Sequence, residues 1–270
     1  MKRIALVQMR SSEDKQENLK KSIDFIAEAA DRGAELVCFP EFQMAFSPGS
    51  QSAAELAKIA EKVKGGDFVA GLAAAARKNK IGVVATIYEK SGERSNRVYD
   101  TAVMLSPAGR VSAVYRKLHL YNALGFKESA KLMPGKKITK PAKTGAGSVG
   151  LLICYDLRFP ELSRILTVKG ADVLVAPSAW VAGEMKEEHW QTMVKARAIE
   201  NGSYVIAPDQ LGNIYCGRSM AVDPFGVVLV DMGQREGVEV IDIDKSRVKK
   251  IRQSLPLLKN RRTDVYKLSY

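Results

Sequence analysis

The sequence predicts an α/β fold in which two mixed β-sheets pack together and helices cover them outside. Short β-branched runs alternate with segments of helical spacing, which is typical of layered α/β proteins. Apolar residues fill both faces of several runs, such as 151–153 and 173–175, as expected for strands buried on both sides. About eleven strands are many for one open sheet, so two packed sheets would bury them better.

The predicted strands are short, apolar and rich in β-branched residues, and in chain order they are Arg3–Met9, Leu36–Pro40, Ile81–Tyr88, Thr101–Leu105, Val111–Tyr115, Val149–Cys154, Val173–Ala176, Tyr204–Ala207, Ser219–Val222, Val227–Val230 and Val238–Ile243. The predicted helices carry apolar residues at helical spacing, and most are bounded by glycine or proline: Asn18–Ala30, Ala53–Val63, Phe68–Arg77, Glu161–Val168, Glu187–Glu200 and Lys245–Gln253. Pro-x-Gly turns at 106–109 and 223–226 predict two similar hairpins.

The whole chain, residues 1–270, is predicted to form one domain, because no linker or low-complexity segment interrupts this pattern. Its composition, 46% hydrophobic and 27% charged, is that of an ordinary globular protein. The N-terminal apolar run is too short for a signal peptide, and no segment approaches the ~20 apolar residues of a membrane span. A cytoplasmic protein without a membrane partner is the simplest prediction.

The charge and the cysteines exclude several classes of function. The formal net charge is +12, but the basic residues are scattered and no nucleic-acid motif accompanies them, so no nucleic-acid partner is predicted. The three cysteines, Cys38, Cys154 and Cys216, form no CxxC pair. With only His119 and His189 besides, no metal site is predicted.

Two charged residues follow predicted strands, where α/β folds usually place ligands. Glu41 comes directly after Pro40, and burial there would raise the pKa of its carboxyl toward the range of a general base. Lys117 ends the strand that begins at Val111. Taken alone, each residue is more simply interpreted as a solvated group at a strand end.

Cys154 ends the predicted strand Val149–Cys154, and a helix is predicted to begin near Pro160. A nucleophile at such a strand-to-helix turn is exposed beside backbone N–H groups, which can stabilise an oxyanion. The alternative is an inert core thiol, the usual state of a free cysteine. Asp156, Arg158 and Glu161 argue against that alternative, because a core would not hold so many charges.

Together these segments resemble the nitrilase-type carbon–nitrogen hydrolase superfamily. Each motif is modest alone, but the ordered set is specific and covers nearly the whole chain: Pro40-Glu41, Arg116-Lys117-Leu118-His119, Phe126-Lys127-Glu128-Ser129, Cys154 to Glu161, Ala176 to Trp180, His189-Trp190, Lys195 to Asn201, Asp223 to Gly226 and Arg261 to Tyr266. The resemblance implies a four-layer αββα sandwich of two mixed β-sheets covered by helices. It also implies a homodimer or higher homo-oligomer and no cofactor.

The resemblance further implies a cysteine-dependent hydrolysis of a carbon–nitrogen bond through a thioester. Cys154 would be the nucleophile, Glu41 the base that accepts its proton, and Lys117 the cation that lowers the pKa of the thiol. Lys117 and the backbone N–H of Tyr155 would stabilise the oxyanion. Glu128 would orient Lys117 and the substrate, while His119 would be structural.

The substrate is the most open question. The motifs look most like the branch that contains omega-amidases and deaminated-glutathione amidases, which implies a dicarboxylic monoamide as substrate. Tyr121, Trp180 and Arg158 are the candidate pocket residues, with a structural ion pair as the alternative for Arg158. The loop 122–125 is shorter than is usual in that branch, so the pocket is expected to differ.

Three other functions are alternatives for a chain with these residues. An N-carbamoyl amide hydrolase would use the same Glu41, Lys117 and Cys154. A true nitrilase is disfavoured, because Cys154-Tyr155 stands where nitrilases commonly have Cys-Trp. A non-catalytic scaffold is disfavoured by the intact set of reactive residues.

Overall fold

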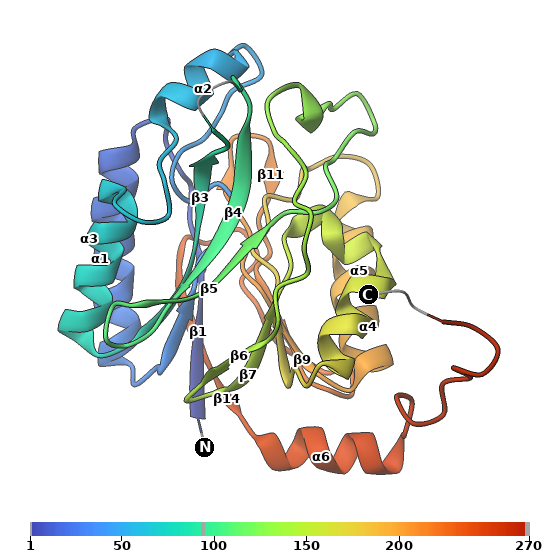
Figure 1. The fold of residues 1–270 in the computed structure, drawn as a ribbon. Helices are drawn as coiled ribbons and strands as arrows, with labels where there is room; N and C mark the ends of the chain where they lie inside the picture. The colour runs from blue at the N-terminus through green and yellow to red at the C-terminus, as the bar shows by residue number, and fades with distance from the viewer. Residues whose placement is uncertain (1, 93–94, 268–270) are drawn as a thin grey trace.

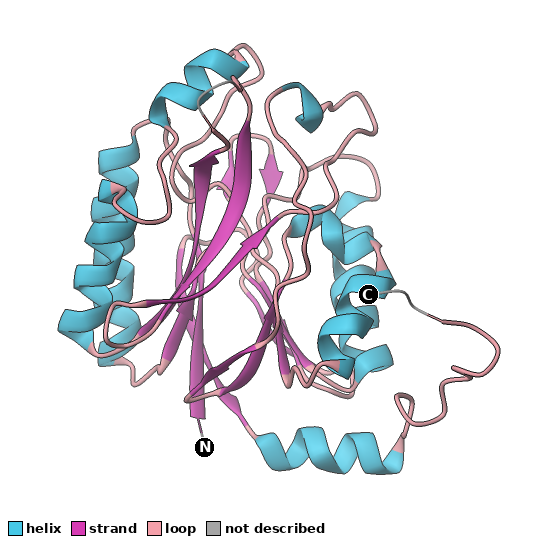
Figure 2. Cartoon of the chain, in the orientation of Figure 1, coloured by secondary structure: helices cyan, strands magenta, loops and turns pink. Residues whose placement is uncertain are grey.

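The computed structural model describes residues 2–92 and 95–267 and contains two six-stranded sheets that pack together (Figure 1). The strand order is β14-β1-β2-β3-β4-β5 in the first sheet and β13-β12-β9-β8-β7-β6 in the second. Helices lie outside both sheets, as Figure 2 shows. The predicted four-layer αββα sandwich of mixed sheets is confirmed.

The first sheet contains β1 (Lys2–Gln8), β2 (Leu36–Cys38), β3 (Gly82–Lys90), β4 (Val98–Leu105), β5 (Val111–Arg116) and β14 (Gly237–Ile243). The second sheet contains β6 (Ala142–Thr144), β7 (Gly147–Leu151), β8 (Val173–Val175), β9 (Tyr204–Ala207), β12 (Met220–Val222) and β13 (Val228–Asp231). A separate two-stranded ribbon pairs β10 (Leu211–Gly212) with β11 (Tyr215–Cys216).

The helices are α1 (Lys15–Asp31), α2 (Ala53–Ile59), α3 (Asp67–Asn79), α4 (Pro160–Val168), α5 (Lys186–Asn201) and α6 (Lys245–Ser254). Helices α1 and α3 cover the outer face of the first sheet, and α4 and α5 cover that of the second (Figure 1). Helix α1 begins three residues earlier than predicted, because the Asp14 carboxylate accepts hydrogen bonds from the backbone N–H groups of Gln16 and Glu17.

The strands of the first sheet separate two apolar cores. Ile4 and Leu6 of β1 belong to the core shared with the second sheet, whereas Ala5 and Val7 pack in the core beneath α1 and α3. This division follows from the two-residue period of a strand, whose successive side chains point to opposite faces. Both faces are apolar because both are covered.

The topology gathers several strand ends at one edge of the sandwich. β1, β2 and β3 are parallel, as are β7, β8 and β9. β5 runs in the same direction as β3, because each of them is antiparallel to β4. The segments that follow β2, β5, β7 and β8 therefore begin at neighbouring ends of strands.

The structure corrects several predicted boundaries. The strand predicted to end at Cys154 ends at Leu151, and Cys154 instead begins a short 3₁₀ helix, η2 (Cys154–Arg158). The sequence did not predict β6, β10 or β11, which have only two or three residues and therefore no readable period. Among the described helices, none combines the length and the apolar character that a membrane crossing requires.

Candidate active site

Glu41 lies just beyond β2 and is completely buried. Its backbone N–H donates to Ser178 O at 3.2 Å, and its own carbonyl accepts from the Gln210 amide at 2.9 Å. Its Oε2 accepts from the Ala179 backbone N–H at 2.8 Å. Segments that follow the strands of the second sheet therefore hold a carboxylate that the first sheet delivers.

Lys117 follows β5 and places its ammonium group between two carboxylates. Its Nζ lies 2.7 Å from Glu41 Oε1 and 2.9 Å from each carboxylate oxygen of Glu128. These contacts occupy all three ammonium hydrogens. Burial opposes the charged form, yet Glu128 and Glu41 raise the pKa of Lys117 well above its ordinary value. Lys117 is therefore a fixed cation at neutral pH.

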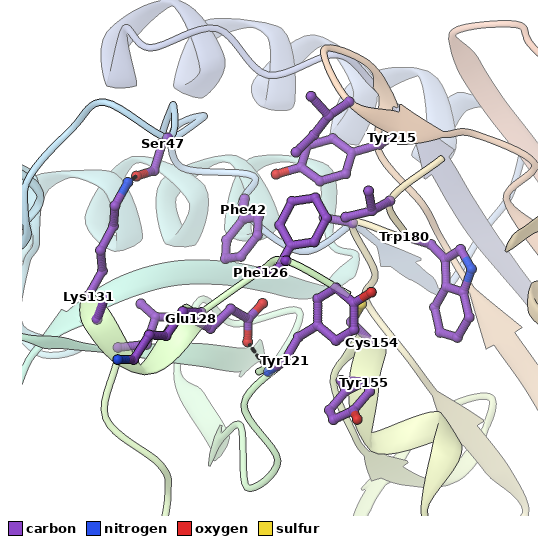
Figure 3. A pocket seen from close by; sticks show the side chains of 18 of the residues that line it. Phe42, Ser47, Tyr121, Phe126, Glu128, Lys131, Cys154, Tyr155, Trp180 and Tyr215 are labelled. Atoms are coloured by element: carbon purple, nitrogen blue, oxygen red, sulfur yellow. Dashed lines mark hydrogen bonds between the residues drawn. The ribbon is translucent and has the colours of Figure 1, made fainter. Parts of the chain in front are cut away.

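Glu128 begins a short 3₁₀ helix, η1 (Glu128–Ala130), and reaches the same ammonium group from the pocket side. Its Oε2 also accepts from the Tyr121 backbone N–H at 2.8 Å (Figure 3). Burial raises its pKa, with a further contribution from Glu41, while Lys117 opposes the shift. Glu128 thus ties the loop that precedes it to the cation.

Cys154 opens η2 in a left-handed backbone conformation, with φ of 44°. Such a conformation is uncommon for a residue other than glycine and must be held by its surroundings. The backbone N–H of Cys154 donates to Pro177 O at 2.9 Å. The side chain is 7% exposed and lines a pocket shared with Glu128 and Tyr121 (Figure 3).

The buried side chain of Asp156 holds the turn that carries Cys154. Its Oδ2 accepts from the Ile153 backbone N–H at 2.9 Å and from the Tyr115 hydroxyl at 2.6 Å. Its Oδ1 accepts from the His119 backbone N–H at 3.1 Å and lies 2.6 Å from His119 Nδ1. One carboxylate therefore fixes the turn to the segment around Lys117.

The pKa of the Cys154 thiol is controlled mainly by burial. Burial raises it well above its ordinary value, and Glu41 and Glu128 add to the rise, although Lys117 acts in the lowering direction that the sequence predicts. Lys117 and the backbone N–H of Ala179 oppose this shift without reversing it. The resting group is therefore a thiol, and attack on a substrate requires a base beside it.

The pocket next to Cys154 has a volume of about 460 Å³. All three residues predicted to bind substrate, Tyr121, Trp180 and Arg158, line it, as does Tyr155. The Arg158 guanidinium lies 4.6 Å from the centroid of the Trp180 ring, its Nη2 lies 3.4 Å from His189 Nδ1, and no described carboxylate forms an ion pair with it.

Several lining residues were not predicted from the sequence, because they lie in loops, in strands without a reactive neighbour or, for Lys186, at the start of a helix: Phe42, Tyr88, Phe126, Lys131, Lys186 and Tyr215. Lys186, the first residue of α5, is the least expected of them. It is 7% exposed, its ammonium donates to the Tyr121 hydroxyl at 2.7 Å, and it lies 4.8 Å from the centroid of that ring. Among the described residues, no carboxylate forms an ion pair with it.

The other cysteines and His119 pack away from the pocket. His119 stacks on Phe159 with a centroid separation of 3.7 Å, in agreement with the structural role expected of it. Cys38 lies in the core between the sheets, where burial raises its pKa, and Cys216 contacts Asp209. In the part of the chain that the structure describes, no group of three metal-ligating side chains occurs.

Comparisons with known proteins agree with this architecture. The family model described as carbon–nitrogen hydrolase matches residues 3–253. A deaminated glutathione amidase from Synechocystis is 37% identical over 95% of this chain and 97% of its own length. The NitFhit protein of C. elegans has a TM-score of 0.89 and 30% identity, over 98% of this chain and 66% of that chain.

A solved amidase from Nesterenkonia, in which acrylamide has added to the active-site cysteine, has a TM-score of 0.80 with 27% identity. This match covers 98% of this chain and 98% of that chain. The likeness therefore extends across the whole sandwich, including the segments that bring the strand ends together.

Proposed function

The chain belongs to the carbon–nitrogen hydrolase family, and we propose that it cleaves the terminal amide of a dicarboxylic monoamide with Cys154, Glu41 and Lys117. One observation carries the proposal. A cysteine on a strained turn lines the same pocket as Glu128, and Glu128 contacts a buried lysine whose ammonium lies between it and Glu41. This set contains a nucleophile, a base and a fixed cation, which are the groups that acyl transfer needs.

In the first step, Glu41 takes the proton of the Cys154 thiol as the sulfur attacks the amide carbon. The burial that raises the pKa of the thiol makes this transfer necessary. A C–S bond forms, and the carbonyl electrons move to oxygen. The oxyanion is stabilised by the charge of Lys117 and by the backbone N–H of Tyr155.

In the second step, the tetrahedral intermediate collapses and the C–N bond breaks. Glu41 returns the proton to the departing nitrogen, which leaves as ammonia, and a thioester remains on Cys154. Glu41 then removes a proton from water, whose oxygen attacks the thioester carbon. The acid leaves, and the sulfur recovers its proton through Glu41. Glu128 keeps Lys117 in place throughout.

The basic lining of the pocket supports a substrate with a second, anionic end. Lys127, Lys131, Arg158 and Lys186 line it, against the single carboxylate of Glu128. A buried cation without a counter-ion is costly, and the carboxylate of a bound substrate would relieve that cost for Lys186. The name of the Synechocystis relative, deaminated glutathione amidase, also points to an amide within a larger acid.

The test is a measurement of ammonia release from matched substrates, with Cys154→Ala as the blank. Succinamate and α-ketoglutaramate should be cleaved faster than the methyl ester of succinamate, which lacks the charge. Release of carbon dioxide together with ammonia from N-carbamoyl amino acids alone would keep the catalytic residues and replace the substrate. Turnover that survives in Cys154→Ala would contradict the nucleophile.

We also propose that the chain forms a homodimer or a higher homo-oligomer, as the family resemblance implies. Apolar side chains on the outer edge of the second sheet support it, since Phe225, Val227 and Leu229 are all more than two-fifths exposed. Light scattering coupled to gel filtration would give the mass, and a monomer at micromolar concentration would contradict the proposal.

A further inference from the structure

Asp100 is a buried carboxyl group at the active site for which the mechanism above has no role. It lies on β4, is 1% exposed, and neither of its carboxyl oxygens has a hydrogen-bond donor among the described residues. Its Oδ2 is 4.0 Å from Lys117 Nζ, and its backbone carbonyl accepts from the Lys117 N–H at 2.9 Å. Buried carboxylates without donors are rare, because burial of an unpaired charge is very costly.

The charges around Lys117 do not balance if every carboxyl group is ionised. Glu41, Glu128 and Asp100 would bring three negative charges to one ammonium group, and only Glu128 among these groups is partly exposed. The ammonium cannot serve all three, since its hydrogens already face Glu41 and Glu128. At least one of the three carboxyl groups must therefore hold a proton at neutral pH.

The hydrogen bonds indicate which of the three carboxyl groups holds the proton. Glu41 accepts from the Ala179 N–H as well as from Lys117, and Glu128 accepts from the Tyr121 N–H as well as from Lys117. Each of these two carboxylates thus has two hydrogen-bond donors. Asp100 accepts from no donor, so its ionised form is the least stable of the three.

We propose that Asp100 is kept protonated and donates a hydrogen bond to the carboxylate of Glu41, which it positions as the resting base. Two acidic oxygens can lie in hydrogen-bond contact only if one of them carries a proton, as in other carboxyl pairs. Burial, followed by the charge of Glu41, raises the pKa of Asp100 well above its ordinary range, and the proposed hydrogen bond would act in the same direction. The titratable groups that face Asp100 are Glu41 after β2, Tyr88 on β3, Tyr115 on β5, Lys117 after β5 and Glu128 on η1.

The hydrogen bond has a consequence for the reaction. Asp100 occupies one acceptor site of Glu41 and so limits the directions from which that carboxylate can take a proton. It also stabilises the carboxylate form of Glu41, and only that form can accept the thiol proton. Asp100 is thus a positioning residue, and its role rests on the proposed function of Glu41 as the base.

The decisive comparison is between Asp100→Asn and Asp100→Ala, with kcat/KM measured from pH 5 to pH 9. The asparagine amide can donate the same hydrogen bond as a protonated aspartic acid, whereas alanine cannot. Asp100→Ala should lose about tenfold to a hundredfold in kcat/KM, as expected for a lost hydrogen bond to a charged group. Asp100→Asn should recover most of that loss and keep the shape of the pH profile.

Two results would overturn the proposal. If Asp100→Asn loses as much activity as Asp100→Ala, the enzyme requires an anion at this position. If neither variant loses activity, the hydrogen bond does not position Glu41. A second measurement does not depend on turnover: the infrared spectrum at neutral pH should contain the C=O band of a buried carboxylic acid, which Asp100→Asn removes.

The infrared measurement also separates this inference from the proposed function. If Glu41→Gln retains full turnover, Glu41 is not the base, yet the carboxylic acid band of Asp100 can still be tested in the unmodified protein. If Glu41→Gln is inactive and the band is missing, the base stands and the protonated Asp100 is wrong.

Discussion

The two sheets contribute opposite kinds of chemistry to one site. The first sheet supplies the charges, since Glu41 follows β2, Lys117 follows β5 and Asp100 lies on β4. The second sheet supplies the proposed nucleophile, Cys154, on a strained turn after β7. The charges are satisfied mainly by one another, whereas the turn is held by backbone contacts and by one buried carboxylate.

This difference indicates how each half would fail. Loss of a charge in the first half leaves buried partners uncompensated, which harms both stability and catalysis. Loss of a contact in the second half moves the sulfur but leaves Glu41, Glu128 and Lys117 in place. Substitutions in the two halves should therefore give different combinations of lost stability and lost turnover.

The largest effect is expected for Lys117→Met. Removal of the cation leaves Glu41 and Glu128 facing each other without compensation, so the free energy of unfolding should fall by about 3–5 kcal/mol. The oxyanion also loses a stabilising charge, so kcat/KM should fall by more than about 1,000-fold. Denaturant titration and steady-state kinetics measure the two quantities.

Lys131→Met is the matched control, because Lys131 lines the same pocket but donates to Ser47 Oγ and Pro48 O. It should cost far less in both measurements. Equal losses in the two variants would show that the charge cluster has no special role.

A smaller effect is expected for Asp156→Ala in the second half. The substitution leaves donors from Ile153, Tyr115 and His119 without their shared acceptor. The free energy of unfolding should fall by about 2–4 kcal/mol, and kcat/KM by roughly 100-fold because the sulfur is misplaced. Asp156→Asn keeps one acceptor oxygen and should lie between alanine and the unmodified protein. A stable Asp156→Ala variant with full turnover would mean that the turn carrying Cys154 keeps its conformation without Asp156.

The sequence predicts the reactive residues of this site better than the groups that surround them. Glu41, Lys117 and Cys154 are visible because each follows an apolar strand, and strand ends of an α/β fold meet at one edge. Asp100 lies within a strand, and its closeness to Glu41 depends on the order β2-β3-β4 and on the loop after β2. A charged residue inside an apolar run was the only signal that could have marked it.

Lys186 and the pKa of Cys154 were beyond prediction for a different reason. Lys186 opens a helix, where a lysine is normally solvated, and only the packing of Tyr121 and Trp180 encloses it. The thiol pKa depends on the balance between burial, two carboxylates and one cation. A sequence names such groups but does not give the degree to which each is removed from water.

A third prediction concerns the rate at which Cys154 reacts with iodoacetamide. Burial and then Glu41 raise the pKa of the thiol, so the thiolate fraction, and with it the rate, should still increase above pH 9. Glu41→Gln removes one of the charges that raise this pKa. The pKa should therefore fall, and alkylation near pH 8 should become faster, on the order of tenfold.

Hydrolysis by the same variant should become slower, because the base is lost. Opposite changes in alkylation and turnover would separate the electrostatic effect of Glu41 from its catalytic one. If Glu41→Gln slows alkylation as well, Glu41 assists thiol ionisation even without a substrate, and burial is not the dominant control. Cys38→Ser and Cys216→Ser in the same background would restrict the signal to Cys154.

The smallest effect is expected for Lys186→Met. This substitution tests whether Lys186 binds the carboxylate at the end of the substrate away from the amide. If the ammonium of Lys186 faces the substrate carboxylate, KM for succinamate should rise by roughly fivefold, which corresponds to an ion pair of about 1 kcal/mol. KM for the methyl ester should not rise, and kcat should change little because Lys186 does not touch the reacting carbon.

Since Lys186 also donates to the Tyr121 hydroxyl, Tyr121→Phe is the needed control: it removes that hydrogen bond and keeps the cation. A rise in KM for both substrates, matched by Tyr121→Phe, would assign Lys186 to packing of the pocket wall and would leave the anionic end of the substrate to Arg158 or Lys131.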